Sequence, residues 1–298
     1  MVISSRRPEP AWRKIIRLLR WDKPAGRLIL MIPALWAVFL GAHSISDGAL
    51  PPLPLVLVIV LGTLATSAAG CVVNDLWDRN IDPKVERTRR RPLAAKALTV
   101  KTGIVVLLVA FVCALILALY LNPLSFVLCV LAVPVIVLYP LAKRVFPVPQ
   151  LVLSLAWGFA VLISWSAVAG DLPIAAWLLW EAVVLWTLGF DTVYAMADRE
   201  DDYRLGVQSS ALYFGPRTPQ AVGLFFLGTV LLLAATGAAL ALNIAFWLTL
   251  AIAAAGWIWQ YRQLRRPKLP ASLYGRIFRQ NVYLGFLLLL GMILGTTT

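Results

Sequence analysis

The chain has 298 residues, of which 61% are hydrophobic and 14% are charged, and its mean hydropathy is +0.83. Soluble globular domains carry about 25% charged residues, so this composition excludes an ordinary soluble protein. Apolar runs of about 17–25 residues recur along the chain, and each is long enough to cross a bilayer as a helix. The alternating pattern of a membrane β-barrel is absent. We therefore predict an all-α integral membrane protein embedded in a lipid bilayer.

The net charge of +13 reflects membrane topology. All 27 Lys and Arg residues fall in five blocks, at 6–27, 79–101, 143–144, 199–217 and 262–279. Neutral connections alternate with these blocks, so one crossing between each block and its neighbouring connection gives nine transmembrane helices. The positive-inside rule places the N-terminus and the basic blocks in the cytoplasm and the C-terminus outside. The pattern argues against a nucleic-acid partner, and the sequence shows no sign of an obligate protein partner.

The expected elements follow in chain order. Residues 12–20 suit a short amphipathic helix on the inner leaflet. We expect the first crossing to remain as an anchor rather than to be cleaved as a signal peptide. The nine crossings are expected at 28–42, 53–73, 102–120, 124–140, 150–168, 174–196, 220–240, 243–261 and 281–296. Since no soluble segment is long enough to fold alone, residues 1–298 are expected to form a single domain.

Cysteine and histidine offer little chemistry. Cys71, Cys113 and Cys129 lie in apolar runs without a CxxC motif, which indicates packing rather than metal binding or redox activity. His43, the only histidine, lies at the neutral end of the first crossing. Acid–base chemistry must therefore rest on carboxylates, Tyr or Lys.

Nine of the 14 acidic residues fall in two short segments. These residues are Asp75, Asp78, Asp82 and Glu86 in the first segment, and Asp191, Asp198, Glu200, Asp201 and Asp202 in the second. Each segment follows an apolar crossing, the second or the sixth. This repetition predicts two similar halves that face each other across a central cavity.

Spacing indicates what the two acidic segments bind. If the helices continue, the first segment has carboxylates at i, i+3 and i+7, and the second at i, i+7 and i+11, so each set shares one face. Such clustered charges repel and need neutralising cations. Mg²⁺ with substrate phosphates would supply them, and so would local ion pairs. The bases placed to help bind a diphosphate are Arg79, Arg87, Arg91, Lys143 and Arg144. The spacing favours the metal–diphosphate site and leaves the ion pairs open.

Four segments resemble one known family. NDLWDRNID at 74–82 fits the NDxxDxxxD motif of the UbiA-type intramembrane prenyltransferases, and VERTRRRPL continues it. DTVYAMADREDD at 191–202 resembles the second aspartate motif of the 4-hydroxybenzoate polyprenyltransferase branch. WDKPAGRLILMIPALWA and YPLAKRVFPVPQLVLSLAWG are similar to the same branch. The resemblance covers nearly the whole chain in order.

The resemblance implies Mg²⁺-dependent transfer of a polyprenyl chain from its diphosphate to the ring of 4-hydroxybenzoate, in ubiquinone or plastoquinone biosynthesis. Position by position, it implies one Mg²⁺ on Asn74, Asp75, Asp78 and Asp82, and a second on Asp198 and Asp202. Lys143 and Arg144 match the family's basic pair and would bind diphosphate or the benzoate carboxylate, or would serve only as a membrane-surface anchor. Lys23 is a weaker candidate for the same work. Asp78 and Asp198 would take part in catalysis through their metals.

Asp191 is the third candidate catalytic residue. It precedes Asp198 by seven residues, so it would lie deeper and contact the phenol of the acceptor, as a base or as an orienting group; a structural ion pair is the alternative. Other acceptors (haem, homogentisate or a naphthoate) stay open within the family, although the DTVYAMADRE segment favours hydroxybenzoate. A cation- or proton-coupled transporter is the alternative from another class. The acidic segments lie at helix ends, whereas transport sites usually lie near the midplane.

Overall fold

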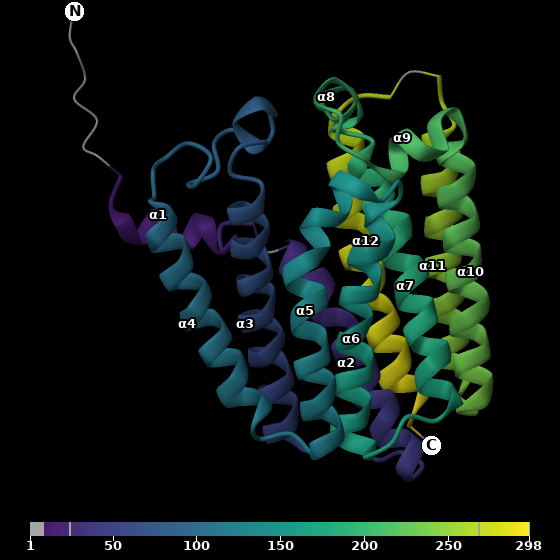
Figure 1. The fold of residues 1–298 in the computed structure, drawn as a ribbon. Helices are drawn as coiled ribbons and strands as arrows, with labels where there is room; N and C mark the ends of the chain where they lie inside the picture. Colours follow the sequence, from purple (N-terminus) through teal and green to yellow (C-terminus); the bar gives the residue numbers. More distant parts are fainter. Residues whose placement is uncertain (1–8, 24, 268, 298) are drawn as a thin grey trace, which may run out of the picture.

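The computed structural model describes residues 9–23, 25–267 and 269–297, and these ranges contain helices and connections but no strand (Figure 1). Its elements are α1 (Ala11–Leu18), α2 (Ala25–Ile45), α3 (Leu53–Trp77), η1 (Asp82–Lys84), α4 (Val100–Ala118), α5 (Pro123–Val145), α6 (Pro149–Ala169), α7 (Ile174–Ala195), α8 (Arg199–Leu205), α9 (Ser210–Phe214), η2 (Gly215–Arg217), α10 (Thr218–Ala239), α11 (Ile244–Leu264) and α12 (Ser272–Gly295). The predicted all-α class is confirmed.

Nine spans in the described ranges are long and apolar enough to cross a membrane. Six of them are the helices α2 to α7. The seventh is the run Ser210–Ala239, which includes α10, and the last two are α11 and α12. The predicted count of nine is therefore confirmed. Among the helices that form these spans, the largest boundary error is at α12, which begins at Ser272 rather than at 281. Arg276 and Arg279 lie in its first turns, so hydropathy detects only the apolar part of this helix.

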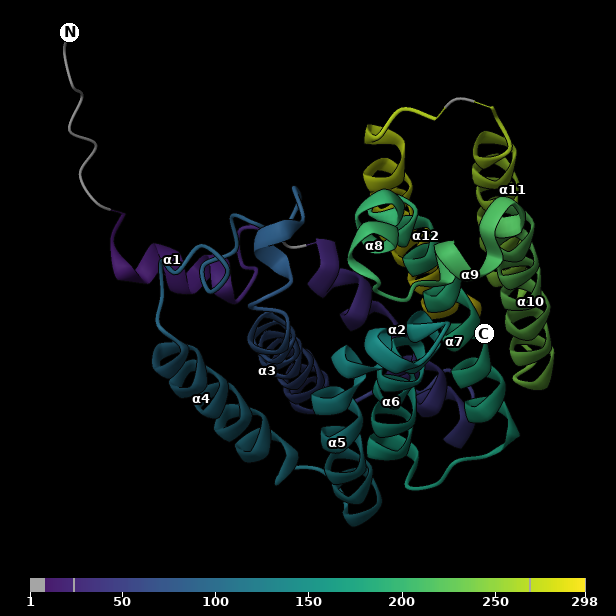
Figure 2. The same cartoon turned by 45° about the horizontal axis from the view of Figure 1, so that its top comes forward.

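The pair α3 and α4 stands apart from the other membrane-spanning helices. Figure 2 shows α3 and α4 together on one side, with α5, α6, α2 and α7 in the middle and α10 and α11 on the far side. The most extensive packing joins α7 with α10 and α2 with α6, followed by α3 with α4 and α6 with α7. Because α3 packs only lightly against α5 and α6, the α3–α4 pair and the rest of the bundle form the walls of an internal space. The relation between two similar halves stays a prediction.

A buried aromatic core makes one of these walls rigid. The rings of Trp36 (α2) and Trp186 (α7) stack with their centroids 5.0 Å apart. Trp36 Nε1 donates to the backbone oxygen of Gly285 in α12 at 3.0 Å, and Trp186 Nε1 donates to Asn281 Oδ1 at 2.9 Å. Gly285 permits this approach, since a Cβ there would lie 3.0 Å from Trp186 and from Ile32. Satisfied indole N–H groups and stacked rings fix α2, α7 and α12 together.

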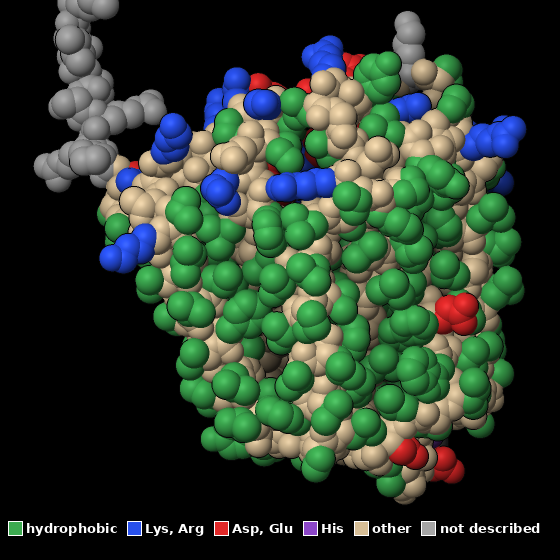
Figure 3. All heavy atoms as spheres, in the orientation of Figure 1, with side chains coloured by type: hydrophobic (Ala, Val, Ile, Leu, Met, Phe, Trp, Pro, Cys, Tyr) green, Lys and Arg blue, Asp and Glu red, His purple; other side chains and the backbone are tan. Residues whose placement is uncertain are grey.

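Basic residues gather at one end of the bundle. We call this the basic end and define it by α1, the loop 78–99 and the segment 196–217. On the face shown in Figure 3, Lys and Arg side chains crowd this end, while hydrophobic side chains cover the flank below it. The predicted amphipathic helix is present as α1, with Leu18 buried and Trp12 57% exposed. The helix α1 therefore lies at the basic end, where Leu18 packs against Val72 of α3 and Leu93.

The helices do not continue through the acidic segments, so the shared helical face that continuous helices would give does not form. The first helix, α3, ends at Trp77, so Asp78 is its C-terminal cap and Asp82 lies in η1. Pro83 disfavours an α-helix through Asp82, and the chain forms only the short 3-10 turn η1 there. In the second segment α7 ends at Ala195, and a turn separates it from α8, whose N-cap is Asp198. Turns, rather than one straight face, bring the acidic residues together.

Candidate active site

A cavity of about 1210 Å³ opens at the basic end and runs into the bundle. Its polar part is lined by residues from both acidic segments and from several bases. The acidic and amide residues are Asn74, Asp78, Asp82, Asp191, Asp198 and Asp202, and the basic ones include Lys23, Arg27, Arg87, Arg91 and Lys143. The two segments thus face one shared space, although 116 residues separate Asp75 from Asp191.

The rest of the cavity is apolar and long. Side chains of α3, α4, α5 and α6 line it, including Val58, Phe111, Leu115 and Val130. On α5 the lining runs from Phe126 to Lys143, which corresponds to roughly 25 Å of helix. The cavity therefore joins a charged mouth to an apolar groove between the membrane-spanning helices.

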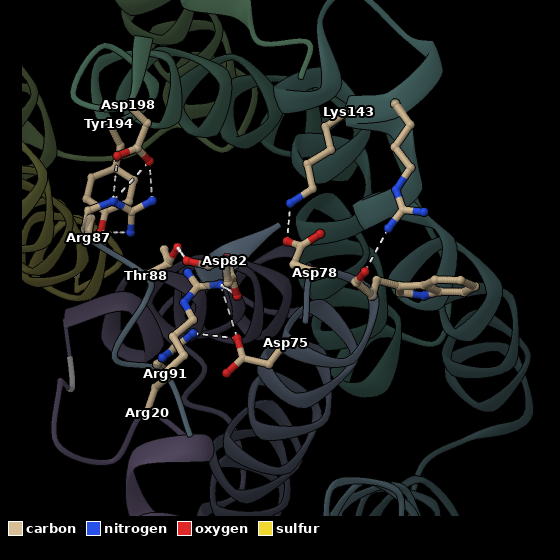
Figure 4. A network of polar contacts seen from close by, with 12 residues as sticks. Arg20, Asp75, Asp78, Asp82, Arg87, Thr88, Arg91, Lys143, Tyr194 and Asp198 are labelled. Atoms are coloured by element: carbon tan, nitrogen blue, oxygen red, sulfur yellow. Dashed lines mark hydrogen bonds and ion pairs between the residues drawn. The ribbon is translucent and has the colours of Figure 1, made fainter. Parts of the chain in front are cut away.

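The first acidic segment is held by arginines (Figure 4). Arg20 Nη2 donates to Asp75 Oδ1 at 2.7 Å, and Arg91 Nη1 lies 3.2 Å from the same oxygen and 2.8 Å from Asp82 Oδ2. Arg91 is 15% exposed and Asp75 is fully shielded. Partly buried, charge-assisted pairs of this kind are stronger than surface ion pairs. Arg91 is thus the link between the end of α3 and η1.

Asp78 points into the cavity from the end of α3 and contacts Lys143 of α5 (Figure 4). Asn74 lies one turn earlier. In the amide orientation that satisfies both groups, Asn74 donates to Asp78 Oδ2 at 3.3 Å and accepts from Arg91 at 3.1 Å. The backbone oxygen of Lys143 also accepts a hydrogen bond from Gln208 N at 2.8 Å. Lys143 therefore connects α3 with the loop after α8.

The second acidic segment is held by Arg87, which reaches across from the loop after η1. Its Nε lies 2.9 and 3.0 Å from the two oxygens of Asp198, and its Nη2 also contacts that carboxylate. Arg87 Nη1 donates to the Tyr194 hydroxyl at 3.0 Å, and the guanidinium lies 4.7 Å from the Tyr194 ring centroid. This contact joins the α3 side of the mouth to the α7 side.

Burial tunes the charges at the mouth. Burial raises the pKa of Asp202 to about 6, and the neighbouring Asp198 adds to the shift. The pKa of Asp78 is also raised by burial, against the opposing effect of Lys143. Burial alone would lower the pKa of Arg87, but its hydrogen bond to Asp198 outweighs burial and leaves the pKa raised. Carboxylates that desolvation disfavours gain most from an added cation.

The donor set suits a hard divalent cation. Asp75 Oδ2 and Asp78 Oδ1 are buried oxygens with no hydrogen-bond donor among the described residues. Carboxylate oxygens are the protein ligands that Mg²⁺ prefers. Within the described ranges, however, no three His, Cys, Asp or Glu side chains come together as a metal site, and the acidic side chains contact Arg20, Arg87, Arg91 and Lys143 instead. The oxygen ligands therefore suit Mg²⁺, while in this structure the carboxylates form ion pairs with Arg and Lys side chains.

The sequence-predicted site residues separate into two groups. Ten line the cavity: Lys23, Asn74, Asp78, Asp82, Arg87, Arg91, Lys143, Asp191, Asp198 and Asp202. Asp75 is buried behind the mouth against Arg20 and Arg91. Arg79 donates to the backbone oxygen of Leu76, and Arg144 to that of Trp77, so both brace the end of α3 and do not face the cavity.

Among the cavity residues that were not predicted, three are notable for their contacts or position. Arg20 pairs with Asp75, Tyr194 binds Arg87, and Arg27 lines the cavity from α2. Tyr194 lies inside the segment DTVYAMADRE, and Arg27 lies inside WDKPAGRLILM, so both were within recognised motifs. Their side-chain directions depend on tertiary packing, which the motif spacing does not give.

Known proteins resemble the whole chain. It is 66% identical over 295 residues to the 4-hydroxybenzoate solanesyltransferase of Synechocystis sp., covering 99% of each chain. It is 43% identical over 251 residues to the 4-hydroxybenzoate octaprenyltransferase of Neisseria meningitidis, covering 83% of this chain and 81% of the relative.

Solved structures share the fold. A UbiA homologue from Aeropyrum pernix matches with a TM-score of 0.76 at 24% identity, covering 89% of this chain and 96% of that one. A UbiA homologue from Archaeoglobus fulgidus, solved with GPP and Mg²⁺, matches with a TM-score of 0.69 at 20% identity, covering 92% and 99%. The sequence model of the UbiA prenyltransferase family matches residues 30–294. The chain is therefore a multi-pass integral membrane protein that belongs to the UbiA prenyltransferase family.

Proposed function

We propose that this protein transfers a polyprenyl chain from its diphosphate to the ring of 4-hydroxybenzoate, ortho to the hydroxyl, in quinone biosynthesis. The observation that carries the proposal is the 66% identity, over 99% of both chains, to a 4-hydroxybenzoate solanesyltransferase. The cavity supports it, since a charged mouth leads into an apolar groove. Family membership leaves the transporter alternative without support. The two curated relatives described above are named for 4-hydroxybenzoate, which favours this acceptor over haem, homogentisate or a naphthoate.

The mouth of the cavity is the proposed diphosphate site. Lys143, Arg87 and Arg91 line it and supply positive charge. The proposed Mg²⁺ ligands are Asn74, Asp75, Asp78 and Asp82 on one side, and Asp198 and Asp202 on the other. A related structure from Archaeoglobus fulgidus, solved with GPP and Mg²⁺, supports a divalent ion for the fold. Mg²⁺, when bound, would act as a Lewis acid that stabilises negative charge on the diphosphate.

The ion pairs indicate how the chain's own residues respond to substrate. In this structure Arg87, Arg91 and Lys143 neutralise Asp198, Asp82 and Asp78. We propose that these bases turn to diphosphate oxygens once the carboxylates bind metal. Arg suits this exchange because its planar fork matches two oxygens at once. Arg79 and Arg144 would then hold the end of α3 rather than bind diphosphate directly.

The proposed reaction is an electrophilic substitution in which the prenyl group replaces a hydrogen of the aromatic ring. The bond between the allylic carbon and the diphosphate oxygen breaks, the diphosphate leaves with the electron pair, and the allylic carbon bonds to the ring. The ring then releases a proton. The apolar groove along α3, α4, α5 and α6 would hold the isoprenoid chain. It would also exclude water from the positive charge that develops on the allylic carbon as its bond to the diphosphate breaks.

Asp191 is proposed to act on the phenol of the acceptor. It lines the cavity from α7, four residues before that helix ends. We expect Asp191→Asn to lower kcat about 10²-fold if its carboxylate takes the ring or hydroxyl proton, in line with the usual contribution of general base catalysis. The KM for prenyl diphosphate should stay within twofold. An unchanged turnover of 4-hydroxybenzoate would remove Asp191 from the acceptor site.

The proposed topology places the basic end in the cytoplasm and the C-terminal end of α12 on the opposite side. The gathering of Lys and Arg at one end supports this orientation under the positive-inside rule. We propose that residues 1–298 act as one domain, since the cavity is lined from α2 through α12. The proposed binding partners are the two substrates and the lipid bilayer.

An acceptor panel tests the proposed function. Membranes that contain the protein are given a long-chain prenyl diphosphate, Mg²⁺ and one labelled acceptor: 4-hydroxybenzoate, homogentisate or 1,4-dihydroxy-2-naphthoate. We expect lipid-soluble label with 4-hydroxybenzoate at a kcat/KM at least about 10²-fold above the others, the range available from a site built to bind the substrate's polar groups. A preference for another acceptor would keep the family and overturn the acceptor assignment.

A further inference from the structure

Arg27 is a buried base with an unmet need for an anion. It lies in the first turn of α2, is 5% exposed and lines the cavity. Its Nε donates to the backbone oxygen of Arg20 at 3.3 Å, and its guanidinium lies 5.1 Å from the Trp21 ring centroid. Both Nη1 and Nη2 are buried without an acceptor among the described residues. Burying a charge without a compensating partner is unfavourable, so this guanidinium is poised to bind a negatively charged group.

Arg27 differs in this respect from the other bases of the site. It is the only Lys or Arg that is buried within the described ranges. Arg20, Arg91 and Lys143 each contact a carboxylate of the first acidic segment, and Arg87 contacts the second. Asp22 lines the same cavity and acts on the charge of Arg27, but no acidic side chain of the described residues forms an ion pair with it. Its partner is therefore expected to come from a substrate.

The depth of Arg27 separates it from the diphosphate site. Cys71 of α3 is within electrostatic range of its charge and lines the same cavity. Cys71 precedes the end of α3 by six residues, about 9 Å along the helix, and Asp191 precedes the end of α7 by four, about 6 Å. Asp78 and Asp198 follow these helix ends. Besides the carboxylates at the helix ends, the cavity is thus lined by a base from the first turn of α2 and by an acid inside α7.

We propose that Arg27 binds the carboxylate of the aromatic acceptor and selects an acidic phenol over a neutral one. This inference rests on the proposed function. A guanidinium with two free Nη groups suits a carboxylate, which accepts two parallel hydrogen bonds. A benzoic acid with its hydroxyl para to the carboxyl group presents an anion at one end and a phenol at the other. Arg27 then binds the carboxylate, Asp191 contacts the phenol, and Lys143 binds the diphosphate.

The test compares Arg27→Gln and Arg27→Lys with the wild-type protein in membranes. With 4-hydroxybenzoate, Arg27→Gln should raise the acceptor KM about 10- to 100-fold, the usual range for a lost charge-assisted hydrogen-bond pair. The KM for prenyl diphosphate should stay within twofold. With neutral 4-hydroxybenzamide, wild type and Arg27→Gln should have equal kcat/KM. Arg27→Lys, which keeps the charge but loses the fork, should give an intermediate KM for 4-hydroxybenzoate.

Arg265→Gln is the matched control, because Arg265 also lies over an aromatic ring, 5.8 Å from the centroid of Tyr261, but is exposed. It should behave as wild type. In detergent, 4-hydroxybenzoate should raise the unfolding temperature of the wild type but not of Arg27→Gln, a difference that a structural role alone does not produce.

Three results overturn the inference: an unchanged acceptor KM in Arg27→Gln, an equal loss with the amide and the acid, or a raised KM for prenyl diphosphate instead. If Arg27→Gln does not accumulate, Arg27→Lys decides by the same comparison of acid and amide. Failure of the wild type to prenylate 4-hydroxybenzoate would overturn the proposed function itself. The two failures are therefore distinguishable.

Discussion

Asp78→Asn is expected to lower kcat at least about 10³-fold, equal to about 4 kcal/mol of transition-state stabilisation. Asp78 is 1% exposed, faces the cavity and keeps one buried oxygen without a donor. The substitution preserves volume but removes the charge that we propose to bind Mg²⁺. Turnover with saturating substrates, and the amount of protein in the membrane, are the measurements.

The ion pair with Lys143 offers a rival explanation for that loss, because Asp78→Asn also leaves a partly buried ammonium unpaired. A titration of activity against Mg²⁺ separates the two. If Asp78 binds the ion, Asp78→Asn should raise the Mg²⁺ concentration that gives half-maximal activity. If Asp78 only neutralises Lys143, that concentration should stay at the wild-type value. Glu86→Gln is the matched control, since Glu86 lies in the same loop with 72% of its side chain exposed, and it should retain wild-type turnover.

Asp198→Asn is expected to have a similar effect from the other side of the cavity. Asp198 is held by the bidentate contact with Arg87 and lines the mouth beside Asp202. Loss of its charge should lower kcat about 10³-fold at ordinary Mg²⁺ concentrations. It should also raise the Mg²⁺ concentration that gives half-maximal activity, because the second proposed ion loses a ligand. A titration of activity against Mg²⁺ measures both effects.

Glu200→Gln is the control for the second site. Glu200 lies two residues further along, in α8, with 90% of its side chain exposed, and makes only a 3.8 Å contact with Arg204. Its substitution should leave the Mg²⁺ titration unchanged. A normal titration in Asp198→Asn, or an equal loss in Glu200→Gln, would contradict a specific metal role for Asp198.

The membrane architecture was predictable from the sequence because hydrophobic length and charge position each report it directly. The nine spans follow from apolar runs, and the basic end follows from the five blocks of Lys and Arg. The start of α12 was misplaced because Arg276 and Arg279 interrupt the hydropathy of a helix that begins nine residues before its expected apolar part. Composition reports where a helix is apolar, not where its hydrogen bonds begin.

The chemistry of the site was predictable only in part. Motif spacing brought Asp78, Asp82 and Asp198 to notice, and the structure gathers them at one cavity. The breaks after Trp77 and Ala195 were not foreseen, since turn geometry depends on how the loops pack. The pairing of Arg87 with Asp198 joins residues 111 positions apart. Neither propensity nor spacing encodes such a contact, and the same holds for the direction of Arg27.

The most direct test of the account is the transfer reaction itself and its dependence on metal. Membranes that contain the protein are given labelled 4-hydroxybenzoate and a long-chain prenyl diphosphate, with Mg²⁺ or with EDTA. The account predicts lipid-soluble label with Mg²⁺, none with EDTA, and recovery when Mg²⁺ is restored in excess. Equal product with EDTA would contradict the proposed metal role of the acidic segments. No product under either condition would contradict the proposed function.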